Sequence, residues 1–419
     1  MVSIATISGN DSLQCESVFI YSCVLQCSVC NLKSIMNNIV LAAIALIEEE
    51  EEEEVLLTTI CKPRCQTNKI FLNRISEGCF NTLIQRHLMD DDTKFKEYFR
   101  LTKSQFFSIL SYISEDITTM PSTFVKYPIS PCQKLAITLR FLATGESFRS
   151  MAFNFRIFHN HISKLVREVL KELRNKLLPI YLPKPTTSEL KQIAEDFNAR
   201  WNFPNCCGAI DGKHIRIVCP KGSGSLYFNY KSYFSIVLLA LIDARYKFTW
   251  VDVGAYGKEG DSGIFQRSSI YQLIHNNNFL PEPTLLPRTD IILPHVIVGD
   301  EAFKLTENVL RPYPRDQAKA DREKKIFNYR LSRARRTSEN AFGILCQTFC
   351  IFYTPIATHP TLVDDIVMVS CCLHNLLRGS LTANHEEGDI DIEMPTENMI
   401  PLRHTGGNIS AAAFQNKCF

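Results

Sequence analysis

The stretch CGAIDGKHIRIV, residues 207–218, has the short, apolar and β-branched pattern of a buried strand. Two segments of the same kind follow it closely, YFSIVLLALID at 233–243 and FTWVDVGAYG at 248–257, and turn residues bound each of them. The tight spacing predicts that the three strands are neighbours and largely antiparallel. HVIVGDEAF, at 295–303, predicts a further short buried strand.

Helical patterns lie on both sides of these strands. Residues 189–201 and 261–275 have a helical period, and so do two runs nearer the C-terminus, NYRLSRARRTSENAFGILC and TLVDDIVMVSCCLHNLLRG. Strands and helices that alternate in this way are typical of a mixed α/β domain. We therefore expect such a domain over residues 181–380.

The segment from residue 90 to residue 180 has only helical patterns. Apolar residues recur with a helical period in QKLAITLRFLATGE, FRSMAFNFR and HNHISKLVREVLKELRNKL. Short breaks at 145–147 and 158–160 separate these helices, which is typical of a helix-turn-helix unit. An ordinary helical bundle fits the same spacing. The sequence thus predicts an N-terminal all-helical domain beside the α/β domain.

The composition excludes a wholly disordered chain. Of the 419 residues 45% are apolar, and 46 Lys and Arg against 44 Asp and Glu give a formal net charge of only +2. Residues 1–89 differ from the rest, because they combine Cys-rich patches with seven consecutive glutamates, Glu48–Glu54. Like charges in a row repel and stay solvated, so we expect 1–89 to be poorly ordered or only locally helical. We expect 381–419 to be a loose, acidic and polar tail.

The chain begins without the pattern of a secretory signal. Residues 1–17 lack a basic segment, and the apolar run from Ile39 to Ile47 is nine residues long, against about 20 needed to span a bilayer. We therefore expect no membrane association and a reducing, intracellular compartment, in which the cysteines are buried free thiols.

Four carboxylates stand at positions where acids are informative. Asp211 lies inside the first strand and Asp300 ends the strand HVIVGD, while Asp261 sits in the Gly-rich turn YGKEGDSG and Glu339 on the helix RLSRARRTSENAFGIL. Hard divalent cations prefer oxygen ligands, and two such ions about 4 Å apart can act on a phosphodiester. Two plainer readings remain open. Asp211 could cap a turn, and Glu339 could be a solvated partner of Arg335 at i−4.

A strongly basic segment precedes Glu339. Between Arg311 and Arg336 there are ten Lys or Arg and three acids, a net charge of +7. Such a stripe suits a phosphate backbone, although a solvated helix face would have the same composition.

Taken together, these segments resemble the PIF/Harbinger transposases and the harbinger transposase-derived nucleases, which are DDE superfamily endonucleases. The resemblance covers roughly residues 130–378 and implies a ribonuclease H-like mixed sheet flanked by helices. It further implies cleavage of DNA with a divalent cation, Mg²⁺ or Mn²⁺. The matching motifs, in the order of the family, are GAIDGKHIRI, YKSYFSIVLLALID, VDVGAYGKEGDSGIF, VIVGDEAFKLTENVLRPYP, FNYRLSRARRTSENAFGIL and CCLHNLL.

By motif, the resemblance makes Asp211, Asp261, Asp300 and Glu339 the catalytic and metal-binding acids. The strand order of such a fold favours Asp300 as the second catalytic acid after Asp211. The family's motifs also allow Asp261 in this role, so both remain candidates. The helical segment 130–175 resembles the family's helix-turn-helix region, so we expect residues 90–180 to form a helix-turn-helix-like, DNA-binding domain. It also implies a Myb-like companion protein that helps nuclear entry, and hence a location in the nucleus and also the cytoplasm.

Several residues depart from the family pattern. Lys213 stands where threonine is usual, Lys258–Gly260 replace a Ser-Val-His-like turn, and Thr348 and Cys350 stand at positions that are usually basic. Because all four acids are present, we expect a metal-dependent DNA endonuclease. The departures motivate the alternative of a domesticated, sequence-specific DNA-binding protein that does not cut. A phosphodiesterase for small substrates is a third reading, and it predicts a closed pocket in place of an open basic groove.

Overall fold

The structure, a computed structural model, describes residues 68–123, 127–276 and 279–383. The expected Cys- and Glu-rich features of the N-terminal region and the acidic tail therefore lie almost entirely outside the described residues. The chain forms two compact units, Met1–Asn73 and Arg74–Phe419. In the first, the described part is the short helix α2 (Lys69–Leu72). All other described elements belong to the second unit.

A five-stranded mixed sheet forms the centre of the second unit. Its order is β3-β2-β1-β6-β7, in which β1 pairs antiparallel with β2 and parallel with β6. β2 pairs antiparallel with β3, and β6 pairs parallel with β7. The predicted α/β class and the antiparallel arrangement of the first three strands are confirmed, and the order is that of a ribonuclease H-like sheet. The strand bounds are β1 Cys206–Arg216, β2 Ser235–Ile242, β3 Phe248–Tyr256, β6 Val296–Val298 and β7 Val309–Leu310.

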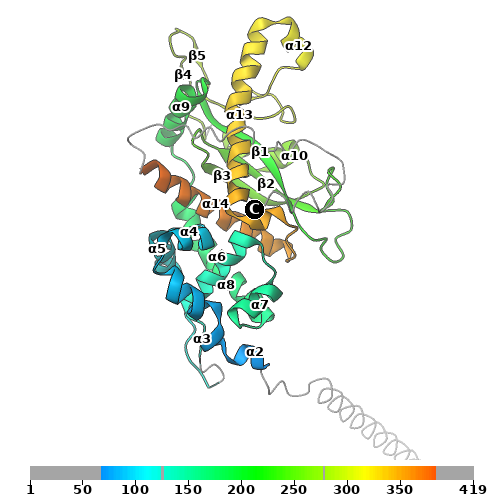
Figure 1. Cartoon of the computed structure of the whole chain (residues 1–419). Coiled ribbons are helices and arrows are strands. Elements are labelled where there is room, and N and C mark those ends of the chain that lie inside the picture. Colours follow the sequence, from blue (N-terminus) through cyan, green and yellow to red (C-terminus); the bar gives the residue numbers. More distant parts are fainter. Residues whose placement is uncertain (1–67, 124–126, 277–278, 384–419) are drawn as a thin grey trace, which may run out of the picture. The chain divides into compact units, whose positions relative to one another are not determined.

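Each face of the sheet is covered by a different set of helices. Because successive side chains of a strand point to opposite faces, Ile210 of β1 packs in a cluster with Ile264 and Phe265, whereas Ala209 packs with Leu331 and Ala334. The first cluster belongs to the helices after β3, and the second to one long helix that crosses the other face (Figure 1). These helices are α10 (Asp261–Arg267), α11 (Ser269–His275) and the long α13 (Arg322–Thr348), with α9 (Thr187–Trp201) contributing to both clusters.

The residues before the sheet are helical, as predicted. Helical structure begins earlier than Asp90, since Phe80, Ile84 and Leu88 of a π-helix are already buried. Gly145 and Arg156 adopt left-handed backbone conformations and end two of the helices that resemble a helix-turn-helix unit. The elements are α3 (Arg74–Glu77), η1 (Phe80–Leu88), α4 (Asp92–Phe99), α5 (Lys103–Ile113), α6 (Pro131–Thr144), α7 (Phe148–Phe155) and α8 (His159–Tyr181).

The last helix connects the helical part with the sheet. α14 (Pro360–Ala383) packs against both α8 and β3, so Arg74–Phe419 is one compact unit across the domain boundary expected near residue 180 (Figure 1). Within the described residues it is also the one helix long and apolar enough to cross a bilayer, over Pro360–Gly379, but 61% of that window is buried inside the protein. Burial of this kind is typical of a core helix. The remaining elements are β4 (Thr284–Leu285), β5 (Ile292–Leu293), α12 (Arg315–Ala320) and η2 (Cys350–Tyr353).

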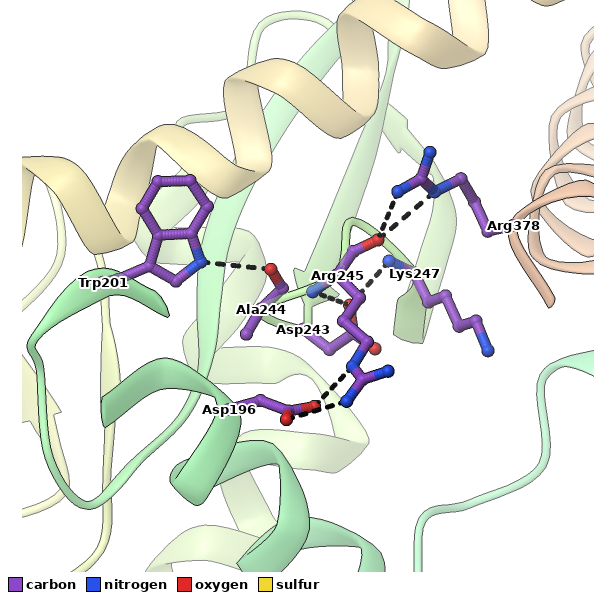
Figure 2. A network of polar contacts seen from close by, with 7 residues as sticks. All are labelled: Asp196, Trp201, Asp243, Ala244, Arg245, Lys247 and Arg378. Carbon is purple, nitrogen blue, oxygen red and sulfur yellow. Dashed lines mark hydrogen bonds and ion pairs between the residues drawn. The ribbon is translucent and has the colours of Figure 1, made fainter. Parts of the chain in front are cut away.

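The turn between β2 and β3 is fixed by a polar network (Figure 2). The Asp243 carboxylate accepts hydrogen bonds from the backbone N–H groups of Arg245 (2.8 Å) and Lys247 (2.7 Å), and its burial raises its pKa to about 6. The Arg245 guanidinium donates to both carboxylate oxygens of Asp196 on α9, at 2.7 and 3.0 Å. The network therefore attaches α9 and α14 to this end of the sheet. Further contacts are from Trp201 Nε1 to Ala244 O (3.1 Å) and from Arg378 Nη2 (3.2 Å) and Nε (3.3 Å) to Arg245 O.

Candidate active site

Strand pairing brings Asp211 and Asp300 together. Ala209 of β1 is paired with Val298 of the parallel neighbour β6, and each aspartate follows its residue by two positions. Residues two apart along a strand point to the same face, and neighbouring strands lie about 4.8 Å apart. The two carboxylates therefore extend from adjacent positions on the face that α13 covers. Asp300 also fixes the turn after β6, because its Oδ1 accepts a hydrogen bond from Ala302 N (2.9 Å).

The Asp211 carboxylate is held by two groups. Its Oδ1 accepts a hydrogen bond from Gly212 N (2.9 Å), and the hydroxyl of Ser338, a buried residue of α13, donates to its Oδ2 (3.1 Å). The pKa of Asp211 is raised to about 6, chiefly by burial, with smaller contributions from the neighbouring Asp300 and Asp261, while the positive charge of Arg335 opposes the rise. Ionisation of the Asp211 carboxyl is therefore unfavourable unless additional positive charge lies near it.

Asp261 approaches the same strand from the other face of the sheet. It begins α10, and its carboxylate lies directly against the Cα of Gly212, where any side chain would overlap with it. Its Oδ1 is buried and has no hydrogen-bond partner among the residues that the structure describes. Burial raises the pKa of Asp261 to about 6 and repulsion by Asp300 adds to this, while Lys231 opposes it. Glycine at 212 is therefore what allows this third acid to reach β1.

Glu339 lies apart from the three aspartates. It is one residue after Ser338 on α13, but its side chain is 52% exposed and accepts a hydrogen bond from Arg335 Nη2 at 2.7 Å. The i−4 pairing that the sequence left open is thus present. Since the Arg335 charge also lowers the pKa of Asp211, one guanidinium acts on Glu339 and on Asp211.

The donor chemistry of the cluster suits a hard cation, although the ligand set is not closed. The three aspartates influence one another electrostatically, and the orphaned Asp261 Oδ1 is an oxygen ligand without another partner. Within the part of the chain that the structure describes, no three His, Cys, Asp or Glu side chains converge closely enough to hold a metal ion. A divalent ion would need the carboxylates to draw together, and Glu339 would have to leave Arg335.

The basic stripe, residues 311–336, lies on the surface. α12 and the first half of α13 carry it, and it overlaps the part of α13 that packs on the sheet through Leu331 and Ala334 (Figure 1). Most of its cations are exposed, while its buried positions, such as Ala318 and Leu331, are apolar. The helix therefore presents positive charge to solvent on the approach to Ser338 and Glu339.

Two residues of this site were not singled out from the sequence. Ser338 lies on the apolar stripe of α13, four residues after Ala334 and three before Ala341, so the helical period alone placed it against the sheet. Gly212 is adjacent to Asp211. Only the fold shows why glycine is required there, because the Asp261 carboxylate occupies the space that a side chain would fill.

Comparison with known proteins gives a family match over the sheet and its C-terminal helices. Residues 210–375 match the family described as DDE superfamily endonuclease. Protein ALP1-like of Arabidopsis thaliana is 27% identical over 296 residues, which cover 68% of this chain and 71% of that protein. Antagonist of like heterochromatin protein 1, also from Arabidopsis thaliana, is 27% identical over 296 residues, 69% of this chain and 74% of its own length.

A third relative is HARBI1 of Xenopus laevis, which its name describes as a candidate nuclease. It is 20% identical over 282 residues, covering 65% of this chain and 76% of that protein. No solved structure matches the chain significantly. The matched segment contains all four acids, so the family resemblance seen in the motifs is confirmed.

Proposed function

We propose that this chain is a transposase-derived nuclease that cleaves DNA phosphodiester bonds with divalent metal, since residues 210–375 match the DDE superfamily endonuclease family. The observation that carries the proposal is the pairing of Ala209 with Val298, which brings Asp211 and Asp300 to adjacent positions beneath α13. Asp211, Asp300 and Glu339 would hold the metal, with Asp261 as an additional ligand. When bound, Mg²⁺ or Mn²⁺ would supply the Lewis acidity that activates a water and stabilises the leaving oxygen.

The residues around the acids have distinct roles in this proposal. Gly212 N and the Ser338 hydroxyl orient the Asp211 carboxylate, and Arg335 holds Glu339 until the ligand set closes. The exposed cations of residues 311–336 bind the phosphate backbone of DNA and direct it toward α13. The helix-turn-helix-like segment adds a second DNA contact. A nuclear location and a Myb-like companion remain parts of the proposal that rest on the sequence resemblance.

Asp300 is favoured over Asp261 as the second acid. Asp211, Asp300 and α13 share one face of the sheet, whereas Asp261 reaches β1 from the opposite face, through the space left by Gly212. Consistent with this, the charge of Asp300 raises the pKa of Asp211 more than that of Asp261 does. We therefore propose Asp211, Asp300 and Glu339 as the core set.

Plasmid cleavage tests the proposal. The purified full chain is incubated with Mg²⁺ or Mn²⁺ and a supercoiled plasmid that carries candidate terminal repeats. Asp211→Asn, Asp300→Asn and Glu339→Gln should each abolish nicking, as should EDTA, whereas Asp290→Asn, on an exposed turn, should leave it unchanged. Absence of nicking by the unaltered chain, or equal nicking by Asp211→Asn, would overturn the catalytic assignment.

The second candidate is a DNA-binding protein that no longer cuts. The Arg335–Glu339 ion pair favours it, because it keeps the fourth acid away from the aspartates. One relative is named as an antagonist of a heterochromatin-like protein, which fits a role at chromatin. Retention of DNA without nicking, together with an unchanged melting temperature in Mn²⁺, would support this candidate. A metal-induced rise that Asp211→Asn removes would support the nuclease.

A further inference from the structure

The connection between β1 and β2 has an unusual charge and aromatic content. From Gly212 to Ile242 the sequence contains no acidic residue but four cations, and five aromatic residues fall within positions 227–234. The cations are Lys213, Arg216, Lys221 and Lys231, and the aromatic residues are Tyr227, Phe228, Tyr230, Tyr233 and Phe234. Cations interleaved with aromatic rings are typical of surfaces that bind single-stranded nucleic acid.

A buried asparagine fixes the tip of this connection. Asn229 Oδ1 accepts hydrogen bonds from the backbone N–H groups of Lys231 (2.9 Å) and Tyr233 (3.2 Å), and its Nδ2 donates to Ser235 Oγ (2.8 Å). Asn229 N also donates to Tyr233 O (3.0 Å). These contacts close a tight turn with Tyr230 and Lys231 at its tip. The turn is held by Asn229 and by backbone groups, so the side chains of Tyr230 and Lys231 are not needed to form it.

The Tyr230 ring is 74% exposed, although its position is defined. Its edge contacts the His214 ring, with centroids 5.4 Å apart, and Lys231 Nζ lies 5.3 Å from its centroid. His214 in turn shares a hydrogen bond with Ser235 Oγ (2.9 Å). The ring is therefore exposed to solvent and held in place by its neighbours, so it can be reached by a planar ligand.

The exposed ring stands next to the acidic cluster. His214, which Tyr230 contacts, is two residues beyond Gly212, a separation of about 7 Å along a strand. Lys231 acts electrostatically on both His214 and Asp261. The connection is tied to the turn before Asp261 as well, because Lys258 N donates to Leu226 O (3.2 Å). The Tyr230 surface and Asp261 are thus parts of one region, on the face of β1 opposite Asp211.

We propose that Tyr230 is a stacking surface for an unpaired nucleobase of a DNA strand that passes Asp261, with Lys231 binding the adjoining phosphate. The inference rests on the proposed function and specifies its substrate as DNA with unpaired nucleotides beside the cleavage point. The acid-free sequence complements a phosphate chain, and a ring whose surface is largely open can stack on any base. An acidic peptide would satisfy the cations, but it would leave the exposed ring without a planar partner.

Binding of short DNA duplexes tests this proposal. The full chain is titrated, in Ca²⁺, with blunt duplexes and with duplexes that carry a three-nucleotide 5′ or 3′ overhang containing 2-aminopurine. We expect tighter binding of one overhang and quenching of its fluorescence. Loss of one base–aromatic stack should make Tyr230→Ala about 5- to 150-fold weaker on that overhang, with less than a twofold effect on the blunt duplex. Tyr230→Trp should retain both the affinity and the quenching.

Two controls define the outcome. Tyr353→Ala removes another exposed tyrosine, on η2, and should have no effect. Lys231→Ala should weaken all duplexes and reduce the salt dependence by about one phosphate contact. Equal affinity of the unaltered chain for blunt and overhanging DNA, or a Tyr230→Ala effect below twofold, would overturn the proposal. Overhang binding that depends on Tyr230 in a chain that does not nick would instead contradict only the nuclease assignment.

Discussion

Removing the charge of Asp211 should stabilise the metal-free protein. Burial raises the pKa of this carboxyl from 3.8 to about 6, so keeping it ionised in the fold costs about 3 kcal/mol at pH 8. Asp211→Asn removes this cost but retains the local contacts, because the amide oxygen still accepts from Gly212 N and the amide N–H can donate to the Ser338 hydroxyl. We therefore expect the free energy of unfolding to rise by about 3 kcal/mol at pH 8.

The gain should depend on pH in a defined direction. Between pH 3.8 and about 6 the folded wild type binds more protons at Asp211 than the unfolded chain does. Its stability therefore falls as the pH rises through this window and is constant above it. The Asp211→Asn variant has no such dependence at this position, so the difference between variant and wild type should be near zero at pH 4 and complete by pH 7.

Urea denaturation at pH 4, 5, 6, 7 and 8 in EDTA measures this difference. Asp290→Asn, on the exposed turn between β4 and β5, is the matched control and should follow the wild type at every pH. A series in Mn²⁺ should reverse the order of stability, because only the wild type retains the carboxylate that would bind the ion. A difference between Asp211→Asn and wild type that does not grow with pH would refute the reasoning.

Three further substitutions test the packing around the site and the sheet. Gly212→Ala places a methyl group against the Asp261 carboxylate and should cost about 1–3 kcal/mol in urea denaturation, whereas Gly260→Ala, with open space around it, should be neutral. Asn375→Ala removes the hydrogen bonds of a buried amide to Phe248 N (2.9 Å), Phe248 O (2.7 Å) and Tyr181 O (2.7 Å), and should lower the unfolding free energy by about 1–3 kcal/mol. Arg245→Ala leaves the Asp196 carboxylate without its two hydrogen bonds and should destabilise by about 1–3 kcal/mol, while Lys94→Ala, which breaks an exposed ion pair, should cause no measurable change.

The sequence predicted the larger elements because their signals are local. The β-branched runs of β1, β2 and β3 lie close together and are bounded by turns, so their existence and antiparallel pairing follow from short-range chemistry. β7, Val309–Leu310, was not predicted, since two residues carry no periodicity. The early start of the helical part was also missed, because the apolar residues of the π-helix Phe80–Leu88 follow a glutamate-rich region with a different composition.

The acids show where local signals end. Asp211, Asp261 and Asp300 could each be located from motifs, but the choice between the last two depends on which face of the sheet each occupies. That face is set by strand register: Ala209 opposite Val298 places Asp211 and Asp300 with α13, and the missing side chain of Gly212 admits Asp261 from behind. Both facts arise from pairings between segments about 50 or more residues apart, and a register shift of one residue would exchange the faces.

Arg335 illustrates the same limit and gives the site its most specific feature. The sequence offers two roles for it, one of ten cations in a phosphate-binding stripe or the i−4 partner of Glu339, but no link to Asp211. In the fold it donates to Glu339 and offsets the charge of Asp211, so it occupies the electrostatic role that a divalent ion would take. Arg335 provides positive charge to both carboxylates but does not bring them together, because its hydrogen bond holds the Glu339 side chain against its own helix. In the proposed nuclease a metal ion would therefore compete with Arg335 for these carboxylates, and the ion concentration needed for binding would depend on Arg335 as well as on the acids.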